Sequence, residues 1–261
     1  MFRPKKSLGQ NFLIDKNIIN KIVSLTKIKK KNIVEIGPGT GNLTKEIIKQ
    51  EPNSLILIEK DKFLSKDLNN NFKNKKTKAF NKDILNFNLE KIIKKNSIIF
   101  GNLPYNISSQ ILIKIIKFKD WLPKYDKLIL MFQKEVADKI LANHNTSSYG
   151  RISIITKYRL RIVDHFDVSM NCFFPKPKVN STVLVFEPKK ENFFRIKDLN
   201  KLEKITHIFF SGKRKMINKA FKKIFINHVE AANKLNIDLT TRPSQISEEE
   251  YYKITNLFEK L

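Results

Sequence analysis

The feature that most constrains the fold of this chain is the alternation of short apolar runs with longer amphipathic segments over its first two thirds. Apolar runs at 32–37 and 55–61 are each followed by residues whose apolar side chains recur at helical spacing. Further apolar runs at 77–85, 97–105 and 127–132 continue the pattern. Strands that alternate with helices are typical of a doubly wound α/β fold. The continuous apolar run at 55–61 suits a strand buried on both faces of a parallel sheet.

The last third of the chain has a different pattern. Two further β-like runs, 152–159 and 181–188, are followed by a charged stretch without strand periodicity. From residue 201 onward, apolar residues recur at every third and fourth position, which predicts helices. We therefore expect an α/β domain at 1–189 and a small helical domain at 190–261.

The charge of the chain favours a polyanionic partner. The 261 residues include 51 Lys and Arg against 25 Asp and Glu, which gives a formal net charge of +26. So positive a field attracts nucleic acid. The lysines are spread over nearly every segment, however, so charge alone does not identify a binding face.

Other bulk features point to a reducing, aqueous environment. The single cysteine, Cys172, excludes an intrachain disulfide and favours a reducing compartment. The four histidines are scattered without metal-ligand spacing. No apolar run approaches the roughly 18 residues needed to span a bilayer. We expect a cytoplasmic protein that binds no metal and no membrane, with a monomer as the default state.

A glycine loop joins the first predicted strand to a helix. The segment 34–44, VEIGPGTGNLT, places Gly37 and Gly39 in a G-x-G-x-G spacing. Glycines allow a tight turn and close approach of the backbone to a ligand. The spacing differs from the dinucleotide fingerprint G-x-G-x-x-G and resembles motif I of S-adenosylmethionine-dependent methyltransferases. On its own the loop is weak evidence for a cofactor, because many α/β turns contain glycines.

Carboxylates follow the next two predicted strands. Glu59 ends the second strand and Asp83 ends the third. Ligands of open α/β sheets bind at these carboxyl ends, where a carboxylate can accept hydrogen bonds from ribose hydroxyls. Glu59 suits that role, and Asp83 can accept from an adenine amino group, with Ile84 packing nearby. Either residue alone could be a solvated loop residue, but the loop and both acids together predict an adenosine-containing cofactor. NAD remains an alternative at this point.

The fourth predicted strand ends in the sequence Asn102-Leu103-Pro104-Tyr105, which resembles the (N/D)-P-P-(Y/F/W) motif of amino-group methyltransferases. An adenine amine is a poor nucleophile because its lone pair is delocalised into the ring. The Asn102 side-chain oxygen and the Leu103 carbonyl can accept its two N–H groups and favour a pyramidal nitrogen. Pro104 fixes the backbone, and Tyr105 offers a ring on which the base can stack. Such chemistry is mainly positioning; an ordinary turn with a buried tyrosine is the structural alternative.

A second aromatic side chain is expected opposite Tyr105. Within 172–181, CFFPKPKVNS, the prolines make a stiff extended loop that can hold Phe173 against an extruded base. Phe174 is the competing candidate, because alternation points one of the two rings inward and the other toward the core.

Taken together, these motifs resemble the KsgA/Dim1 family of ribosomal RNA adenine N6,N6-dimethyltransferases. The resemblance covers nearly the whole chain in the family's order. The segments that carry it are KKSLGQNFL (5–13), VEIGPGTGNLT, GNLPYNIS, QKEVADKI, YGRISI (149–154), FFPKPKVNSTV and the basic FFSGKRKMINKAF (209–221).

The resemblance implies a Rossmann-like class I methyltransferase domain and specific roles for its residues. Asn11 and Leu13 would close over S-adenosylmethionine. The substrate would be two adjacent adenines in a hairpin near the 3′ end of small-subunit ribosomal RNA, in an immature subunit, and each would receive two methyl groups. The RNA backbone would be held by Lys213, Arg214 and Lys215. The family's cofactor-contacting positions fall on Asn11, Leu13, Gly37, Gly39, Glu59, Asp83 and Asn102.

Two departures from the family pattern and three rival functions remain. Lys213 stands where the family often has Arg, which removes a bidentate phosphate donor, and Asn180 replaces a frequent Asp. The nearest rival is an erythromycin-resistance methyltransferase acting on large-subunit ribosomal RNA. A non-catalytic nucleic-acid-binding relative is a second, although the intact glycine loop and NLPY motif argue against lost catalysis. DNA adenine methylation is weaker still, because no target-recognition insertion is evident.

Overall fold

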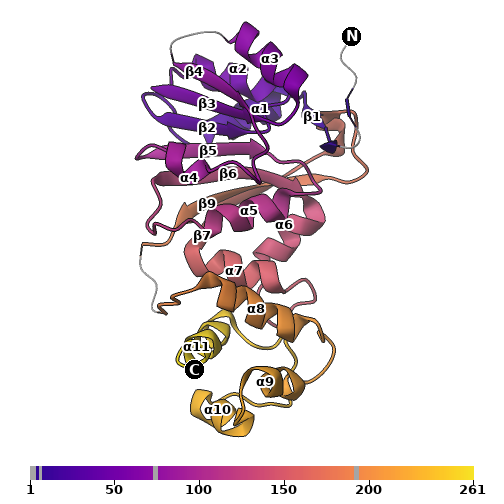
Figure 1. The fold of residues 1–261 in the computed structure, drawn as a ribbon. Coiled ribbons are helices and arrows are strands. Elements are labelled where there is room, and N and C mark those ends of the chain that lie inside the picture. The colour runs from indigo at the N-terminus through magenta and orange to yellow at the C-terminus, as the bar shows by residue number, and fades with distance from the viewer. Residues whose placement is uncertain (1–3, 6–7, 73–75, 191–193) are drawn as a thin grey trace. The chain divides into compact units, whose positions relative to one another are not determined.

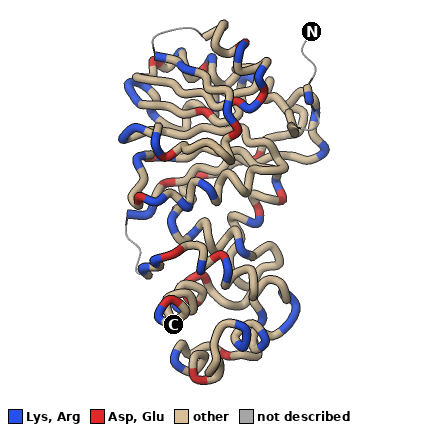
Figure 2. Tube along the Cα trace, viewed as in Figure 1, with Lys and Arg blue, Asp and Glu red and all other residues tan. Residues whose placement is uncertain are grey.

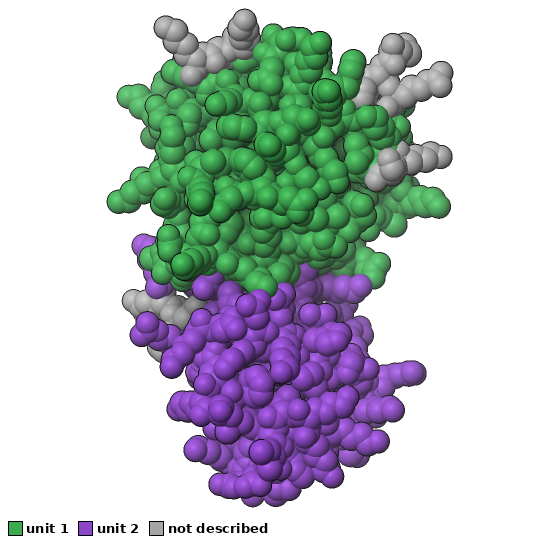
Figure 3. Space-filling view, in the orientation of Figure 1, with its two compact units in different colours: residues 1–137, 161–188 green, residues 138–160, 189–261 purple. Residues whose placement is uncertain are grey.

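The computed structural model describes residues 4–5, 8–72, 76–190 and 194–261 (Figure 1). Lys6 and Ser7 of the predicted N-terminal motif lie outside the described residues. The chain divides into two compact units, one of residues 1–137 and 161–188 and one of residues 138–160 and 189–261 (Figure 3).

A seven-stranded sheet forms the centre of the first unit, in the order β4-β3-β2-β5-β6-β9-β7. The five strands from β4 to β6 run parallel to their neighbours, and β9 is antiparallel to β6. A separate antiparallel pair joins β1 (Phe12–Leu13) to β8 (Phe173–Phe174). The strands of the large sheet are β2 (Asn32–Ile36), β3 (Ser54–Glu59), β4 (Thr77–Asn81), β5 (Ser97–Asn102), β6 (Tyr125–Gln133), β7 (Leu160–Val168) and β9 (Ser181–Pro188).

Helices between the strands bury both faces of this sheet. On one face, Ile19, Ile47 and Leu68 from three helices join alternate strand residues in one apolar cluster. The strand residues between them, such as Ile99 and Leu128, point to the other face and are also buried. The predicted α/β fold with a mostly parallel sheet is therefore confirmed. The helices of this part are α1 (Lys16–Ser24), α2 (Asn42–Lys49), α3 (Lys62–Asn71), α4 (Leu89–Ile92), α5 (Ser108–Ile116) and the first half of α6 (Lys134–Leu141), whose second half belongs to the other unit.

Local capping explains where two of these helices begin. The Asp15 side chain accepts a hydrogen bond from the Ile18 amide (2.9 Å) at the start of α1. The Asp61 side chain accepts from the amides of Phe63 and Leu64 at the start of α3. Such caps satisfy backbone donors that have no partner within the helix. The Asp61 cap also fixes the chain directly after Glu59, the predicted ribose ligand.

The second unit is helical and has an aromatic core. The Phe209 ring packs edge-on against Phe221 (5.6 Å between centroids) and Tyr251 (5.4 Å), a favourable arrangement for buried rings. Lys and Arg are spread over both units (Figure 2). The helices of this unit are α7 (Arg151–Arg159), α8 (Leu199–Phe210), α9 (Asn218–Ile224), α10 (His228–Leu235) and α11 (Glu248–Phe258).

The chain enters the second unit for the last time at Lys189, one residue before the start of the predicted helical domain at residue 190. Residues 138–160 also fall in that unit, although the sequence analysis placed them in the first domain. Their contacts explain this position: the Tyr252 hydroxyl in α11 donates to the Ile154 carbonyl in α7 (2.9 Å), and the Tyr158 and Tyr252 rings lie 5.0 Å apart.

Two secondary-structure predictions need correction. The β-like run 152–159 lies in helix α7, and strand β7 follows it without having been predicted. Isoleucine-rich ISIITKYR has high β propensity, but packing within the second unit outweighs it. No helix among the described residues has both the length and the apolar character that a membrane crossing requires.

Candidate active site

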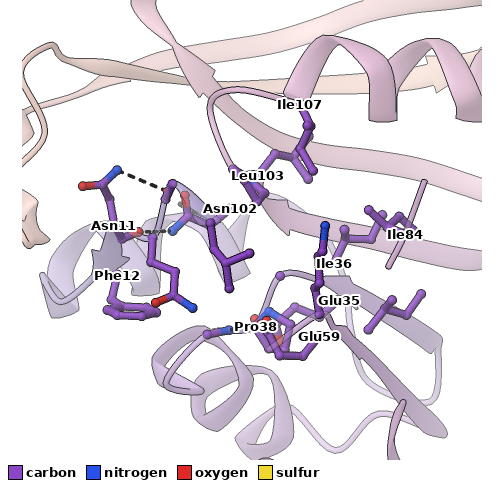
Figure 4. A pocket seen from close by; sticks show the side chains of 18 of the residues that line it. Asn11, Phe12, Glu35, Ile36, Pro38, Glu59, Ile84, Asn102, Leu103 and Ile107 are labelled. Carbon is purple, nitrogen blue, oxygen red and sulfur yellow. Dashed lines mark hydrogen bonds between the residues drawn. The ribbon is translucent and has the colours of Figure 1, made fainter. Parts of the chain in front are cut away.

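A pocket opens in the first unit at the carboxyl ends of the parallel strands, where the fold is expected to bind ligands. In Figure 4, Asn11 and Asn102 lie next to each other at one side, and Glu35, Pro38 and Glu59 gather at another. Six segments line the pocket: 8–13, 35–40, 42–43, 58–60, 82–85 and 102–107.

The glycine loop forms part of the pocket wall in a conformation that requires glycine. Gly37 and Gly39 have φ angles of +69° and +57°, in the left-handed region. A Cβ atom on Gly39 would lie 2.6 Å from Cδ1 of Phe12, and one on Gly37 would lie 3.3 Å from the Asn102 carbonyl oxygen. The loop therefore passes close to the N-terminal segment and to the end of β5, with no room for a side chain at Gly39 and little at Gly37.

Glu59 stands at the end of β3 with its carboxylate fixed by the backbone. Its Oε2 accepts from the Gly39 amide (3.1 Å) and its Oε1 from the Asp61 amide (2.8 Å). Burial raises the pKa of Glu59, although these backbone hydrogen bonds act in the opposite direction. A carboxylate oxygen has two lone pairs, so the group can accept further hydrogen bonds from a ligand in the pocket.

Asp83 follows β4 in a different electrostatic setting. Its Oδ2 pairs with Lys60 Nζ (2.8 Å), and its Oδ1 accepts from the Leu85 amide (2.9 Å). These two hydrogen bonds, that of Lys60 first, hold the pKa of Asp83 below its usual value. Ile84 is buried beside it. A carboxylate acceptor thus lies next to an apolar side chain at the end of this strand.

Asn102 ends β5, and its side-chain amide is oriented by the N-terminal segment. Its Nδ2 donates to the Asn11 carbonyl (3.1 Å) (Figure 4). Because the nitrogen is used in that bond, the amide oxygen is the group left to accept a further hydrogen bond. In the same turn, the Pro104 carbonyl accepts from the Ile107 amide (3.1 Å).

Tyr105 is held from the far end of its ring. Its hydroxyl lies 2.6 Å from the hydroxyl of Ser181, the first residue of β9. The ring is half-buried, and burial raises the pKa of its hydroxyl. A ring fixed at its hydroxyl offers a defined face for stacking.

Leu13 lines the pocket at the end of the N-terminal segment. Its carbonyl accepts from Asn42 Nδ2 (2.8 Å), which ties the N-terminal segment to α2. Its side chain is buried in the apolar cluster of the sheet and pairs with Phe173 across β1 and β8.

The two phenylalanines of β8 differ sharply in exposure. Phe173, the predicted stacking residue, is only 3% exposed and packs in the apolar cluster, whereas Phe174 is 61% exposed. Alternation along β8 sends the rings to opposite sides, and the pairing of Leu13 with Phe173 decides which ring is internal. Phe173, the predicted stacking ring, thus packs in the core, and Phe174, the competing candidate, is the exposed ring of the pair.

The predicted RNA-binding residues divide into two kinds. Lys213 Nζ donates to the carbonyls of Ser147 (2.6 Å) and Tyr149 (3.0 Å), so it anchors the loop before α7. Arg214 and Lys215 are exposed.

Glu35 is a pocket residue to which the sequence analysis gave no role. It lies in β2 at 2% exposure and accepts a hydrogen bond from Thr44 Oγ1 (2.7 Å). Burial, with a smaller contribution from Glu59, raises the pKa of Glu35 to about 8. An acid inside an otherwise apolar strand, VEIG, was the signal that could have identified it.

The described part of the chain holds no group of three or more His, Cys, Asp or Glu side chains suited to a metal ion. Its pocket instead combines a glycine loop, an acid at the end of each of the next two strands, and an Asn-Leu-Pro-Tyr turn after β5. This combination on a doubly wound sheet defines a class I methyltransferase fold.

Comparison with known proteins shows to which family of methyltransferases the chain is similar. A sequence model of the family described as "Ribosomal RNA adenine dimethylase" matches residues 1–260. Ribosomal RNA small subunit methyltransferase A of Pelagibacter ubique (strain HTCC1062) is 46% identical over 259 residues, which are 99% of this chain and 98% of that protein. Its namesake from Malacoplasma penetrans (strain HF-2) is 41% identical over 257 residues, or 97% and 91% of the two chains.

Solved structures agree with this result. A dimethyladenosine transferase from Plasmodium falciparum matches with a TM-score of 0.76 and 25% identity, over 95% of this chain and 98% of the other. The 23S rRNA methyltransferase ErmE matches with a TM-score of 0.67 and 22% identity, over 96% and 99%, which shows a shared fold. The chain belongs to the ribosomal RNA adenine dimethylase family and is an enzyme, a ribosomal RNA methyltransferase.

Proposed function

We propose that this protein uses S-adenosylmethionine to dimethylate the N6 amino groups of two adjacent adenosines in a hairpin near the 3′ end of small-subunit ribosomal RNA. The observation that carries the proposal is the orientation of Asn102, whose Nδ2 donates to the Asn11 carbonyl at the edge of the pocket. An amide whose nitrogen is held in this way has its oxygen left as a hydrogen-bond acceptor, and an acceptor is what the N–H groups of an amine substrate need. The names of the relatives support the small subunit as the source of the RNA.

The residues of the pocket fit S-adenosylmethionine. Gly37 and Gly39 leave room for the backbone to approach it, Glu59 would accept the ribose hydroxyls, and Asp83 would accept the adenine amino group beside Ile84. When bound, this cofactor supplies an electrophilic methyl group. The protein's part is to hold both reactants in line, so the chemistry needs no protein nucleophile.

The target adenine would be held by the turn after β5 and by two rings. The Asn102 oxygen and the Leu103 carbonyl would accept its two N–H groups, which favours a pyramidal nitrogen. Tyr105 and Phe174 would stack on the extruded base, in the manner of enzymes that flip bases. Stacking on an aromatic side chain contributes about 1–3 kcal/mol per base.

Binding outside the pocket would rest on cations of the helical unit. Exposed Arg214 and Lys215 would contact phosphates, so affinity should fall as salt rises. The substrate would be an immature small subunit in the cytoplasm, bound by one monomer. Docking on that subunit would also act as a checkpoint in its assembly.

Methyl transfer to separated ribosomal subunits tests the proposal. Labelled S-adenosylmethionine is incubated with under-methylated small and large subunits, and the modified nucleoside is identified after digestion. We expect dimethyladenosine only in the small subunit, and no product with Asn102→Ala. Label on large-subunit RNA would move the activity to that of the erythromycin-resistance enzymes. Cofactor binding without transfer to either subunit would contradict the proposed substrate.

A catalytically inactive variant tests separately whether docking on the small subunit has a role of its own. Asn102→Ala should still dock on immature small subunits if binding has a function of its own. Normal subunit assembly in cells that carry only this variant would count against the assembly checkpoint.

A further inference from the structure

The turn that carries Asp83 is held by lysines from two other elements. Lys60, after β3, pairs its Nζ with Asp83 Oδ2 at 2.8 Å. Lys114, from α5, donates to the Leu85 carbonyl at 2.6 Å. One lysine thus holds the side chain at the start of the turn, and the other holds the backbone at its end.

The backbone beneath Lys60 is fixed as well. Asn81 Nδ2, in the last residue of β4, donates to the carbonyls of Glu59 (3.1 Å) and Lys60 (3.0 Å). The Lys82 amide donates to the Glu59 carbonyl (3.0 Å). Lys60 is therefore attached to the same strand end that it stabilises, although its own side chain is 55% exposed.

We propose that Lys60 and Lys114 are positioning residues that select a 6-aminopurine in the cofactor by holding the Asp83 carboxylate opposite the exocyclic amine. This inference deepens the proposed function and rests on the adenosine pocket described there. Neither lysine was singled out by the sequence analysis, because each is one of many in a lysine-rich chain.

The chemistry of selection follows from the two purines. A 6-aminopurine offers an N–H donor at its exocyclic position, which a carboxylate accepts. A 6-oxopurine offers a carbonyl oxygen there, and its donor is the neighbouring ring N–H. A carboxylate that could shift would accept that ring N–H instead. The Asp83 carboxylate is held at both oxygens and through its turn, so it cannot shift toward the ring N–H. It would instead face the carbonyl oxygen of the 6-oxopurine, and the repulsion between the two acceptors would disfavour binding of that base.

The charges of Lys60 and Asp83 also favour a 6-aminopurine over a 6-oxopurine. An Asp carboxyl is ionised at neutral pH, and Lys60 lowers the pKa of Asp83 further, so the side chain is an acceptor with no proton to donate to a 6-oxo group. An isolated exposed ion pair would contribute little to stability. The expected effect therefore concerns ligand choice rather than folding.

Calorimetric titration of the full chain with two ligands tests the inference. The ligands are S-adenosylhomocysteine and S-inosylhomocysteine, which differ only at the purine 6-position and its ring proton. We expect wild type to prefer the adenosyl form by at least about a hundredfold, as sites built to pair a polar group do. Lys60→Met and Lys114→Met should each reduce that ratio by about threefold to fivefold, the size of a partly exposed pair.

Matched variants separate positioning from a general loss of charge or structure. Lys60→Arg keeps a cation at the same place and should restore the ratio. Lys62→Met removes an exposed lysine that does not line the pocket and should leave the ratio unchanged. Thermal unfolding of each variant shows whether it is folded. If Lys60→Met does not fold, Lys114→Met provides a second test.

The outcomes separate a failure of the lysines' positioning role from a failure of the adenosine pocket itself. A wild-type preference that falls in both Met variants and returns in Lys60→Arg supports the inference. A preference that stays unchanged in both Met variants, or affinities for both ligands that weaken by the same factor, overturns it. A wild-type protein that binds neither ligand overturns the adenosine pocket, and the inference with it.

Discussion

The two adjacent phenylalanines of β8 allow a sharp separation of stability from substrate binding. Phe173 is 3% exposed in the apolar cluster, and Phe174 is 61% exposed. Removal of a buried phenylalanine ring costs about 3–5 kcal/mol. For a unit of this size that loss corresponds to a decrease in Tm of about 10 °C. Phe173→Ala should therefore unfold at a lower temperature than wild type. At temperatures where the variant is still folded, its kcat/KM should be close to that of wild type.

Phe174→Ala should have the opposite profile. Its ring is largely in solvent, so the free energy of unfolding should change by no more than about 0.5 kcal/mol. Loss of one stacking surface of about 1–3 kcal/mol should lower kcat/KM by about fivefold to a hundredfold. Val179→Ala, at another exposed apolar residue of the same loop, should change neither quantity.

Differential scanning calorimetry and methyl transfer to under-methylated small subunits measure the two effects. An unchanged kcat/KM in Phe174→Ala would refute its role as the stacking ring. Loss of activity in Phe173→Ala without a loss of Tm would show that the internal ring, rather than the exposed one, contacts the base.

Three further predictions concern a buried acid, the glycine loop and the helical unit. Because the pKa of Glu35 is raised to about 8 against an unfolded value near 4.5, the native state holds a proton that the unfolded state releases between these pH values. Its contribution to stability should thus fall as pH rises from about 5 to 8, by up to about 1.4 kcal/mol per pH unit, and urea unfolding of Glu35→Gln should lack this slope. Gly39→Ala places a Cβ atom in the left-handed region, 2.6 Å from a ring carbon, and calorimetry should show cofactor affinity lowered by more than about tenfold; Gly212→Ala, where nothing lies closer than 3.8 Å, should bind normally. Lys213→Met loses two hydrogen bonds to backbone carbonyls and should lower stability by about 1–3 kcal/mol, whereas Arg214→Met should leave thermal unfolding unchanged and reduce the salt slope of RNA binding by about one; equal effects of the two variants on both measurements would contradict this division.

Strand ends were predictable from the sequence where a local pattern determines them. Glu59 and Asn102 are the last residues of β3 and β5, as the apolar runs before them indicate. Asp83 follows β4 for the same reason. Parallel strands end at one edge of the sheet, so these side chains line one pocket.

Features that depend on distant contacts were not predictable in this way. Residues 152–159 carry β-branched side chains, yet they form α7 because its partners, among them Tyr252, come from the end of the chain. The choice between Phe173 and Phe174 depends on pairing with β1, more than 150 residues earlier. Lys213 resembles a phosphate ligand in the sequence, but its ammonium is bound to the loop before α7.

The most direct test of the central claim is the number and position of methyl groups transferred to one small subunit. Mass spectrometry of fragments from under-methylated small-subunit RNA, treated to completion with S-adenosylmethionine, gives both. The account predicts two adjacent dimethylated adenosines in a single hairpin fragment, hence four methyl groups for each subunit, and none with Asn102→Ala. Methyl groups on a single adenosine, on another base, or on large-subunit RNA alone would contradict it.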